Sequence, residues 1–166
     1  MSNKIGLTKG QVTTVPEELY DFLQRFSWHA AKDDNTFYAI RGPRQNEDMK
    51  GKSRRIAMHR VIWEYYNGNI PDGMVIAHID GNGLNNILEN LRCVTPSDRS
   101  KNHSICKNNK SGCTGVKWEQ RRSKWIAYIS IKSKLTRIYY GDLKEDAIAA
   151  RKAAEIEHYG EFVRQE

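Results

Sequence analysis

The segment 74–98 constrains the fold most strongly, because it contains two short apolar runs on either side of a turn-rich loop. The first run, MVIA, ends at His78, and the second is LRCVT at residues 91–95. The sequence DGNGLNN between them is rich in residues that close turns. Thr95, followed by proline and then by the carboxylate of Asp98, forms a capping-box start. The pattern predicts two short strands joined by a loop, and then a helix over about 96–105.

The residues upstream predict a helix, a hairpin and a second helix. The sequence PEELYDFLQRF follows a capping Thr14 and predicts a helix over about 16–26. The runs SWHA and TFYAIR flank the turn KDDN and predict a hairpin, whereas RGPRQNEDMKGKSRR is typical of a loop. A helix over about 55–66 is predicted by side chains that recur on one helical face. They are Ile56, His59, Ile62, Trp63 and Tyr66.

A polar linker, KNNKSGCTG, separates this half of the chain from a second unit. The segments GVKWEQ, KWIAYISI and TRIYYGDL predict three strands, and the alanine-rich KEDAIAARKAAEIEHYG predicts a helix that ends at Gly160. In the middle strand, alternation predicts that Trp125, Ala127 and Ile129 face the helix. The outward set is Lys124, Ile126, Tyr128 and Ser130. The predicted fold class is α+β, with a three-stranded antiparallel sheet packed on one helix in this second unit.

The positive charge of the chain is concentrated in one window. The 166 residues carry 27 Lys and Arg against 20 Asp and Glu, for a net charge of +7. Residues 99–137 alone hold 11 basic residues and one acidic residue, Glu119. Aromatic residues lie among these cations in strand-like segments, which favours a folded nucleic-acid-binding surface over a solvated basic tail.

Composition argues against several classes of protein. No apolar run approaches the roughly 20 residues that span a bilayer, and MSNKIGLTKGQ lacks the apolar stretch of a signal peptide. We therefore expect a soluble protein that is not secreted by that route. The three cysteines have no C-x-x-C spacing, which argues against a disulfide scaffold and a cysteine-rich zinc site.

The segment from about Met58 to Asn102 resembles a known nuclease family. Its sequence H-I-D-G-N-x-L-N-N-x-x-x-N-L-R fixes residue types and spacing together. It is similar to the HNH motif of phage and intron-encoded homing endonucleases, which have the ββα-metal fold. The resemblance implies an HNH nuclease domain over 1–106, with the motif at about 58–103, that hydrolyses a DNA phosphodiester and nicks one strand.

The catalytic base of that family falls on His78, and its central asparagine falls on Asn90. An imidazole is largely neutral at pH 7 and accepts a proton from water. We expect Asn90 to bridge the loop and to hold the tautomer of the histidine through backbone contacts. His59 is interpreted as part of a buried helix face, with phosphate contact as the lesser alternative, and His29 and His158 as structural. The loop residues interpreted as turn-builders are Asp80, Asn82, Asn85 and Asn86.

The resemblance also implies a divalent metal, Mg²⁺ or alternatively Mn²⁺, but two ligand positions depart from the family pattern. The residue before the base is usually Asp or His and here is Ala77, and the helix position that usually holds Asn or His is Arg99. Neither side chain offers a lone pair to a cation. Either the chain is a natural variant with a rearranged metal site, or the substitution was engineered to prevent cleavage. The candidate replacement ligands are Asp98, Asn102 and His103.

Residues 108–163 resemble the APETALA2-type DNA-binding domain of plant ethylene-response factors. The similarity lies in N-N-K-S-G-x-x-G-V-x-W, K-W-x-A-x-I and a helix that ends H-Y-G-E-F. It implies a DNA-binding domain over 107–166 whose outer sheet face lies in the major groove, with Trp118 and Trp125 interpreted as core. Carried over by position, the contacting residues are Lys117, Glu119, Tyr128, Ser130, Arg137 and Tyr139. Further DNA contacts are expected from Arg99, Lys101, Arg121, Arg122 and Lys124.

Together these features predict a monomeric, site-specific DNA endonuclease of the homing type. It would act on double-stranded DNA in the cytoplasm of a bacterial host or phage-infected cell. One alternative is a DNA-binding or regulatory factor that has lost its nuclease, for which Ala77 and Arg99 are the evidence. An RNA-binding module ranks last, because A-form grooves admit strands poorly.

Overall fold

The chain divides between Ser100 and Lys101 into two compact units in the computed structural model. The structure describes residues 2–33, 36–43, 55–101, 108–131 and 134–160. Unit 1 denotes the described residues up to 100, and unit 2 denotes those from 101 to 160. Every helix within these ranges is too short or too polar to cross a bilayer. The predicted domain boundary between residues 106 and 107 lies outside the described residues.

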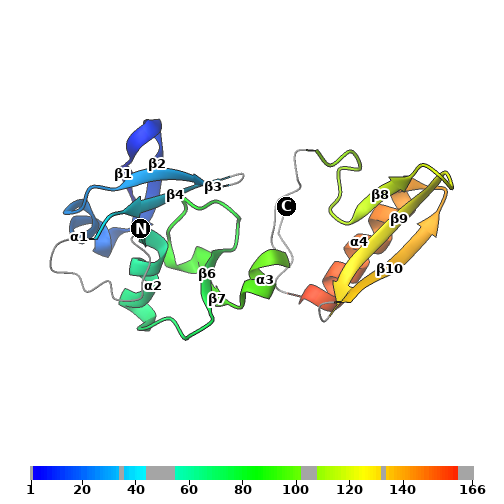
Figure 1. The fold of residues 1–166 in the computed structure, drawn as a ribbon. Coiled ribbons are helices and arrows are strands. Elements are labelled where there is room, and N and C mark those ends of the chain that lie inside the picture. Colours follow the sequence, from blue (N-terminus) through cyan, green and yellow to red (C-terminus); the bar gives the residue numbers. More distant parts are fainter. Residues whose placement is uncertain (1, 34–35, 44–54, 102–107, 132–133, 161–166) are drawn as a thin grey trace. The chain divides into compact units, whose positions relative to one another are not determined.

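Unit 1 is built from short strands and helices (Figure 1). Its elements are β1 (Ser2–Gly6), β2 (Val12–Pro16), α1 (Tyr20–Gln24), β3 (His29–Asp33), β4 (Thr36–Arg41), β5 (Ile56–Ala57), α2 (Met58–Asn67), β6 (Val75–His78) and β7 (Leu91–Val94). After β7, α3 (Pro96–Lys101) runs across the division between the units. Strand β1 pairs with β2, β6 pairs with β7, and β4 lies between β3 and β5, all antiparallel.

The loop between β6 and β7 is attached to two strands that come much earlier in the chain. The backbone N–H of Thr14 in β2 donates to the carbonyl of Leu84 at 2.9 Å, and the N–H of Asn86 donates back to the carbonyl of Thr14 at 2.9 Å. On β4, the hydroxyl of Thr36 accepts the N–H of Gly83 at 3.0 Å. These bonds hold an irregular loop against regular structure.

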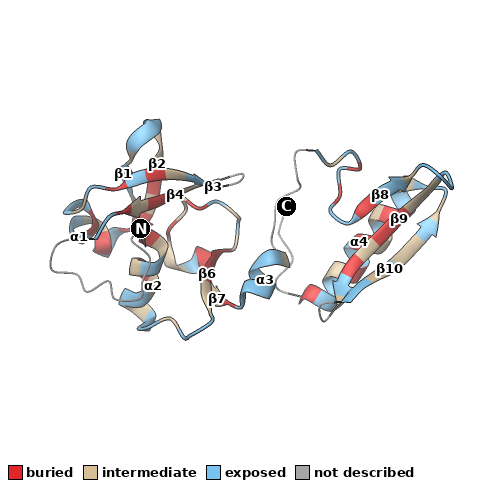
Figure 2. Ribbon diagram, viewed as in Figure 1, coloured by how far each residue is buried: buried red, intermediate tan, exposed pale blue. Residues whose placement is uncertain are grey.

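A hydrophobic core stabilises unit 1. Val15, Leu23, Met58 and Ile62 are fully buried, and together they come from β2, α1 and α2 (Figure 2). Trp28 joins this core and donates its indole N–H to the carbonyl of Leu23 at 2.8 Å. Burial of each such aliphatic side chain contributes about 1.5–3 kcal/mol.

Unit 2 is a three-stranded antiparallel sheet packed on one helix, as predicted. Its elements are β8 (Val116–Glu119), β9 (Lys124–Ile131), β10 (Lys134–Gly141) and α4 (Lys144–Tyr159), with β9 in the middle of the sheet. Ala127 of β9 and Ala147 of α4 are fully buried, and these small side chains allow the helix to lie close to the sheet. Arg151 of α4 is buried between the helix and the sheet, where it bonds to Glu155 and to the carbonyl of Tyr128 in β9.

Several local predictions are confirmed. The β3–β4 hairpin, the strands on either side of the 79–90 loop, and the alanine-rich helix ending at Gly160 all form. At the start of α3 the hydroxyl of Thr95 accepts the N–H of Asp98 at 3.1 Å and donates to its carboxylate at 2.8 Å. The predicted continuation of this helix to residue 105 lies outside the described residues.

The prediction of a helix over 16–26 is wrong in its bounds. Strand β2 continues through Pro16 because it pairs with β1, and a 3-10 turn (Glu17–Leu19) precedes the five-residue α1. Neither β1 nor β2 was predicted from the sequence. The predicted helix over 55–66 also begins later, at Met58, since the preceding residues 56–57 pair with β4 as β5.

In unit 2 the burial of two residues differs from what their positions in the sequence suggest. Ile126 lies on the outer face as predicted, yet it is 1% exposed, because its cross-strand neighbours Lys117 and Tyr140 flank it on both sides. Trp118 was interpreted as core but is 41% exposed. It lies near the end of the edge strand β8, where it contacts Trp125 at 5.4 Å between ring centroids.

We predict that Gly83→Ala destabilises unit 1 by about 1–3 kcal/mol, the usual cost of overpacking. A Cβ at residue 83 would lie 2.5 Å from the carbonyl oxygen of Phe37 and 2.6 Å from the ring of Tyr38. The loop would have to move away from β4. The measurement is equilibrium urea denaturation of the full chain.

The matched control is Gly42→Ala, because a Cβ at residue 42 meets nothing within 4 Å. Its free energy of unfolding should change by less than about 0.5 kcal/mol. Equal effects of the two substitutions would contradict the close approach of the loop to β4.

Candidate active site

His78 is the last residue of β6 and is 5% exposed. Its carbonyl accepts the N–H of Gly81 at 3.2 Å, so the chain turns immediately after it. Its ring Nε2 lies 3.0 Å from Oδ1 of Asn86. The predicted base therefore lies at the junction between a strand and the 79–90 loop, with a side-chain partner from that loop.

Asn86 connects this histidine to β2. It is fully buried, and its Nδ2 donates to the hydroxyl of Thr13 at 2.7 Å. The Thr13 hydroxyl in turn donates to the carbonyl of Leu84 at 2.8 Å. The sequence prediction missed this role and treated Asn86 as a turn-builder. Thr13 is 73 residues from Asn86, so no local pattern indicates the contact.

Asn90 braces the two ends of the 79–90 loop. Its Nδ2 donates to the carboxylate of Asp80 at 2.9 Å and to the carbonyl of Asn85 at 2.8 Å, while its Oδ1 accepts the N–H of Asp80 at 3.0 Å. The backbone N–H of Ile79 donates to its carbonyl at 2.8 Å. These bonds bridge the loop as expected from the sequence, but the side-chain contact with the His78 ring comes from Asn86.

A second imidazole lies beside the first. The ring centroids of His59 and His78 are 5.0 Å apart, and the ring of Tyr38 is 5.7 Å from each of them. His59 is the second residue of α2, and its Nδ1 is buried without a hydrogen-bond partner in the part of the chain that the structure describes. Sequence reasoning placed His59 on a buried helix face, whereas the structure brings it to the candidate base.

The environment lowers the pKa of both histidines. Desolvation lowers the pKa of His59 to about 3, with further lowering from the charges of His78, Arg60 and Arg99. Burial likewise lowers the pKa of His78, although the bond to Asn86 and the charge of Asp80 act in the opposite direction. Both rings are therefore neutral at pH 7, the state in which an imidazole accepts a proton.

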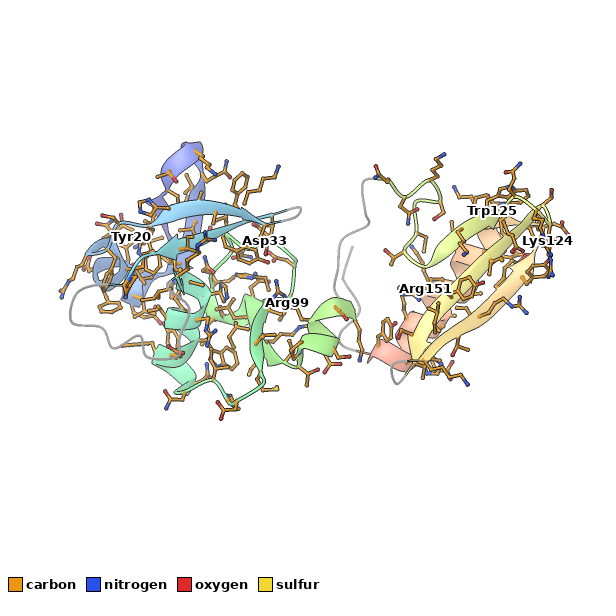
Figure 3. The ribbon with its side chains drawn as sticks, viewed as in Figure 1. Tyr20, Asp33, Arg99, Lys124, Trp125 and Arg151 are labelled. Atoms are coloured by element: carbon orange, nitrogen blue, oxygen red, sulfur yellow. The ribbon has the colours of Figure 1, made fainter. Side chains whose placement is uncertain are left out.

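The described residues do not fit the metal site of the family pattern. Ala77 is buried in β6 and has no donor atom, and Arg99 in α3 carries a positive charge close enough to lower the pKa of both histidines (Figure 3). The Asp98 carboxylate is occupied in the cap of α3. In the described ranges, no group of three His, Cys, Asp or Glu residues is arranged to hold a metal ion. Asn102 and His103 lie outside those ranges.

Unit 2 presents a basic and aromatic outer face on its sheet. Lys117 lies 5.2 Å from the ring centroid of Tyr128, and the guanidinium of Arg137 lies 5.3 Å from that of Tyr140. Ser130 is exposed on the same face. These five residues, which lie on the same side of the sheet as Ile126, are called the outer face from here on.

The remaining predicted contacts differ in their surroundings. Arg121 and Arg122 are exposed in the turn after β8, and Glu119 pairs with Lys124 across the strands. Lys124 forms a 2.6 Å ion pair with Asp142; Figure 3 shows Lys124 and Trp125 at one end of the sheet.

Tyr139 does not belong to the outer face, contrary to the prediction. A register shift between Arg137 and Tyr139 interrupts the alternation of β10. As a result Tyr139 pairs with Ala127 and packs on the core against α4, where its hydroxyl is 3.4 Å from the carboxylate of Asp146. The exposed tyrosine on the outer face is Tyr140.

Comparison with known proteins finds a family match to the segment that carries this site. The HNH endonuclease family matches residues 57–101, a segment that contains both histidines, the 79–90 loop and α3. Protein 3.8 of Escherichia phage T7 is 38% identical over 106 residues, which are 64% of this chain and 87% of that protein. The chain belongs to the HNH endonuclease family.

Two further relatives carry HNH names. The "SPbeta prophage-derived putative HNH homing endonuclease YosQ" of Bacillus subtilis (strain 168) is 41% identical over 51 residues, covering 31% of this chain and 30% of that protein. The "Uncharacterized HNH endonuclease L560" of Acanthamoeba polyphaga mimivirus is 31% identical over 107 residues, covering 64% and 51% respectively. The matched segments thus span 30% of the first protein and 51% of the second. No solved structure matches the chain.

We predict that unit 1 loses stability below pH 6.5. A histidine whose folded pKa is depressed stabilises the protein above the unfolded pKa, near 6.5, and this stability is lost as the pH falls toward the folded value. Each such histidine costs up to about 1.4 kcal/mol per pH unit in this window. The measurement is the free energy of unfolding in urea between pH 7 and pH 5.

His59→Gln should reduce this slope, since it removes the residue with the pKa of about 3. The control His29→Gln changes an exposed histidine at the start of β3 and should keep the slope. Identical slopes for the two variants would contradict the placement of His59.

Proposed function

We propose that this chain is a site-specific DNA endonuclease of the homing type that nicks one strand, with His78 as the general base. The observation that carries the proposal is the placement of His78. It is a neutral imidazole at a strand end, held by the loop that the HNH family match contains. The phage and prophage relatives support a role on DNA inside a bacterial host or phage-infected cell, and we propose that the chain acts there as a monomer.

In this proposal the chain's own residues prepare the attack on phosphorus. His78 takes a proton from the attacking water as the water oxygen bonds to phosphorus. The P–O bond to the 3′ oxygen breaks, and this oxygen leaves as an alkoxide that takes a proton from solvent. Asn90 contributes indirectly, because its bonds to Asp80 and Asn85 fix the loop that begins next to the base. General base catalysis of this kind contributes about 10²–10⁴-fold to the rate.

HNH endonucleases generally use a divalent metal. The donors described in this chain do not fit such an ion, so the proposed steps are limited to those of the protein side chains. Mg²⁺ or Mn²⁺ therefore enters the proposal as a variable of the assay, with Asn102 and His103 as candidate ligands beyond the described residues.

We propose that unit 2 holds the target DNA as an APETALA2-type domain. The observations in support are the sheet packed on one helix and the pairing of cations with aromatic rings on the outer face. Cations on such a face neutralise phosphates, and a guanidinium that reaches a base edge reads sequence. Arg121 and Arg122, which are exposed in the turn, would contact the backbone.

The first test is nicking of a supercoiled plasmid that carries the target. His78→Ala should reduce the rate by about 10²–10⁴-fold, because it removes the base. Mg²⁺, Mn²⁺ and EDTA are compared in parallel.

His29→Ala is the matched control, since His29 is an exposed histidine of unit 1 far from the site in sequence. It should nick at the rate of the unmodified chain, and both variants should keep their affinity for DNA. If His78→Ala nicks as fast as the control, the base is another residue.

A second candidate function is DNA binding without cleavage, as a regulatory or accessory factor. Ala77 and Arg99 favour it, because the usual ligand positions offer no lone pair and the guanidinium repels a cation. A positive charge beside two neutral imidazoles would still attract a DNA phosphate. In this case the site would retain phosphate binding and lose hydrolysis.

Ala77→Asp discriminates between the two candidates. An anionic oxygen at residue 77 supplies the missing donor, so divalent-dependent nicking should rise by about 10²–10³-fold. Adding His78→Ala to the same chain should abolish the gain. If the unmodified chain already nicks as fast as the Asp variant, residue 77 is not a ligand position in this protein.

Arg137 and Arg121 should differ in their effects on DNA binding. Arg137→Ala should relax sequence preference by about 1–3 kcal/mol if the side chain reaches a base edge. Arg121→Ala should weaken every sequence equally, as expected for a phosphate contact. Binding of specific and scrambled duplexes at one salt concentration measures both. Identical effects on all sequences would remove Arg137 as a reader.

A further inference from the structure

We propose that Asn86 and Thr13 are positioning residues that fix the tautomer of His78, with the proton on Nε2 and the lone pair on Nδ1. The inference rests on the proposed function for the role of the base, but the tautomer itself is a property of the folded chain. Its basis is one continuous set of side-chain hydrogen bonds, His78 to Asn86 to Thr13, that ends at a backbone carbonyl.

The direction of each bond follows from the group at the end of the set. The carbonyl of Leu84 can only accept, so the hydrogen of the Thr13 hydroxyl is directed to it. Toward Asn86 the hydroxyl oxygen can then only accept, so the amide atom 2.7 Å away must be the NH₂ group. The amide oxygen therefore faces His78, and because it only accepts, the Nε2 at 3.0 Å must donate. A neutral imidazole that donates from Nε2 has its lone pair on Nδ1.

The opposite amide orientation is disfavoured by burial. Thr13 and Asn86 are both fully buried, so water does not compensate for a misdirected group. A flipped amide would place its oxygen against a hydroxyl oxygen whose hydrogen is already used. It would also turn the NH₂ group away from the sulfur of Met58, which lies 3.8 Å from Nδ2 as a weak acceptor.

Thr13 lies outside the segment 57–101 that the family match covers. It belongs to β2, and the backbone of the neighbouring Thr14 bonds to both Leu84 and Asn86. The N-terminal hairpin therefore supplies both the acceptor that orients the amide and the attachment that holds the loop in place. In this chain, residues outside the segment of the family match therefore take part in the candidate site.

The direct test is nuclear magnetic resonance of the full chain labelled with ¹⁵N at histidine. A protonated and an unprotonated ring nitrogen differ widely in chemical shift, and long-range couplings assign each one. His78 is assigned by comparison with His78→Gln. At pH 7.5, in the absence of DNA, His78 should show a protonated Nε2 and an unprotonated Nδ1. A protonated Nδ1 would overturn the proposal.

Thr13→Val tests the role of the hydroxyl. It keeps the shape of the side chain and removes both the donor and the acceptor, so the amide loses its fixed orientation and His78 should populate both tautomers. Thr13→Ser restores the hydroxyl and should restore the single tautomer. The matched control Thr14→Val makes the same change on the opposite face of β2 and should leave the tautomer unaltered.

The amide spectrum shows whether each variant is folded. A folded Thr13→Val chain with the tautomer of the unmodified protein would also overturn the proposal.

Plasmid nicking separates this inference from the proposed function. If Thr13→Val lowers the maximal nicking rate by about tenfold or more while the DNA concentration at half-maximal rate is unchanged, the positioning role is supported. A tenfold loss is smaller than the roughly 10²–10⁴-fold loss expected when the general base is removed altogether. If the unmodified chain has the expected tautomer but never nicks, the proposed function fails and the positioning stands. If the chain nicks with Nδ1 protonated, the positioning fails and the function stands.

Discussion

The 79–90 loop follows the candidate base and is irregular up to the 3-10 turn at Leu88–Asn90, so its buried polar groups need partners other than those of a strand ladder. Asn90 supplies them from within the loop by bonding to Asp80 and to the carbonyl of Asn85. Strand β2 supplies further partners through backbone bonds and through Thr13, and Thr36 of β4 accepts the N–H of Gly83. The position of His78 depends on these bonds, because the strand that carries it ends where the loop begins. If water satisfied these polar groups instead, the loop would no longer hold His78 in a fixed position.

The electrostatics of the site follow from burial combined with nearby arginines. Two imidazoles at 5.0 Å cannot both ionise easily, and the charges of Arg60 and Arg99 oppose ionisation further. The positive charges of the same arginines attract a phosphate to the site and repel a metal cation. Ala77 is consistent with this, because an alanine at that position supplies no carboxylate that would offset the positive charge.

The sequence predicted those features that depend on neighbouring residues. The strand that ends at His78, the cap formed by Thr95 and Asp98, and the helix that ends at Gly160 each carry a local pattern, and each forms. The contacts of the site with distant parts of the chain were not predictable in this way. Thr13 meets Asn86 across 73 residues, and α2 brings His59 to His78 through packing of the core. Similarly, β2 forms because it has partners on two sides, whereas its own sequence suggested the start of a helix.

The register shift in β10 has a consequence for comparison between sequences. Before it, residue 137 lies on the outer face opposite Tyr128, and after it residue 140 lies there opposite Ile126, a spacing of three where an unbroken strand has two or four. A gap-free alignment of this strand with a regular one would assign every later residue to the wrong side of the sheet. For unit 2, positions assigned by counting therefore keep their side of the sheet only up to the bulge, and beyond it Tyr140 takes the place that simple counting gives to Tyr139.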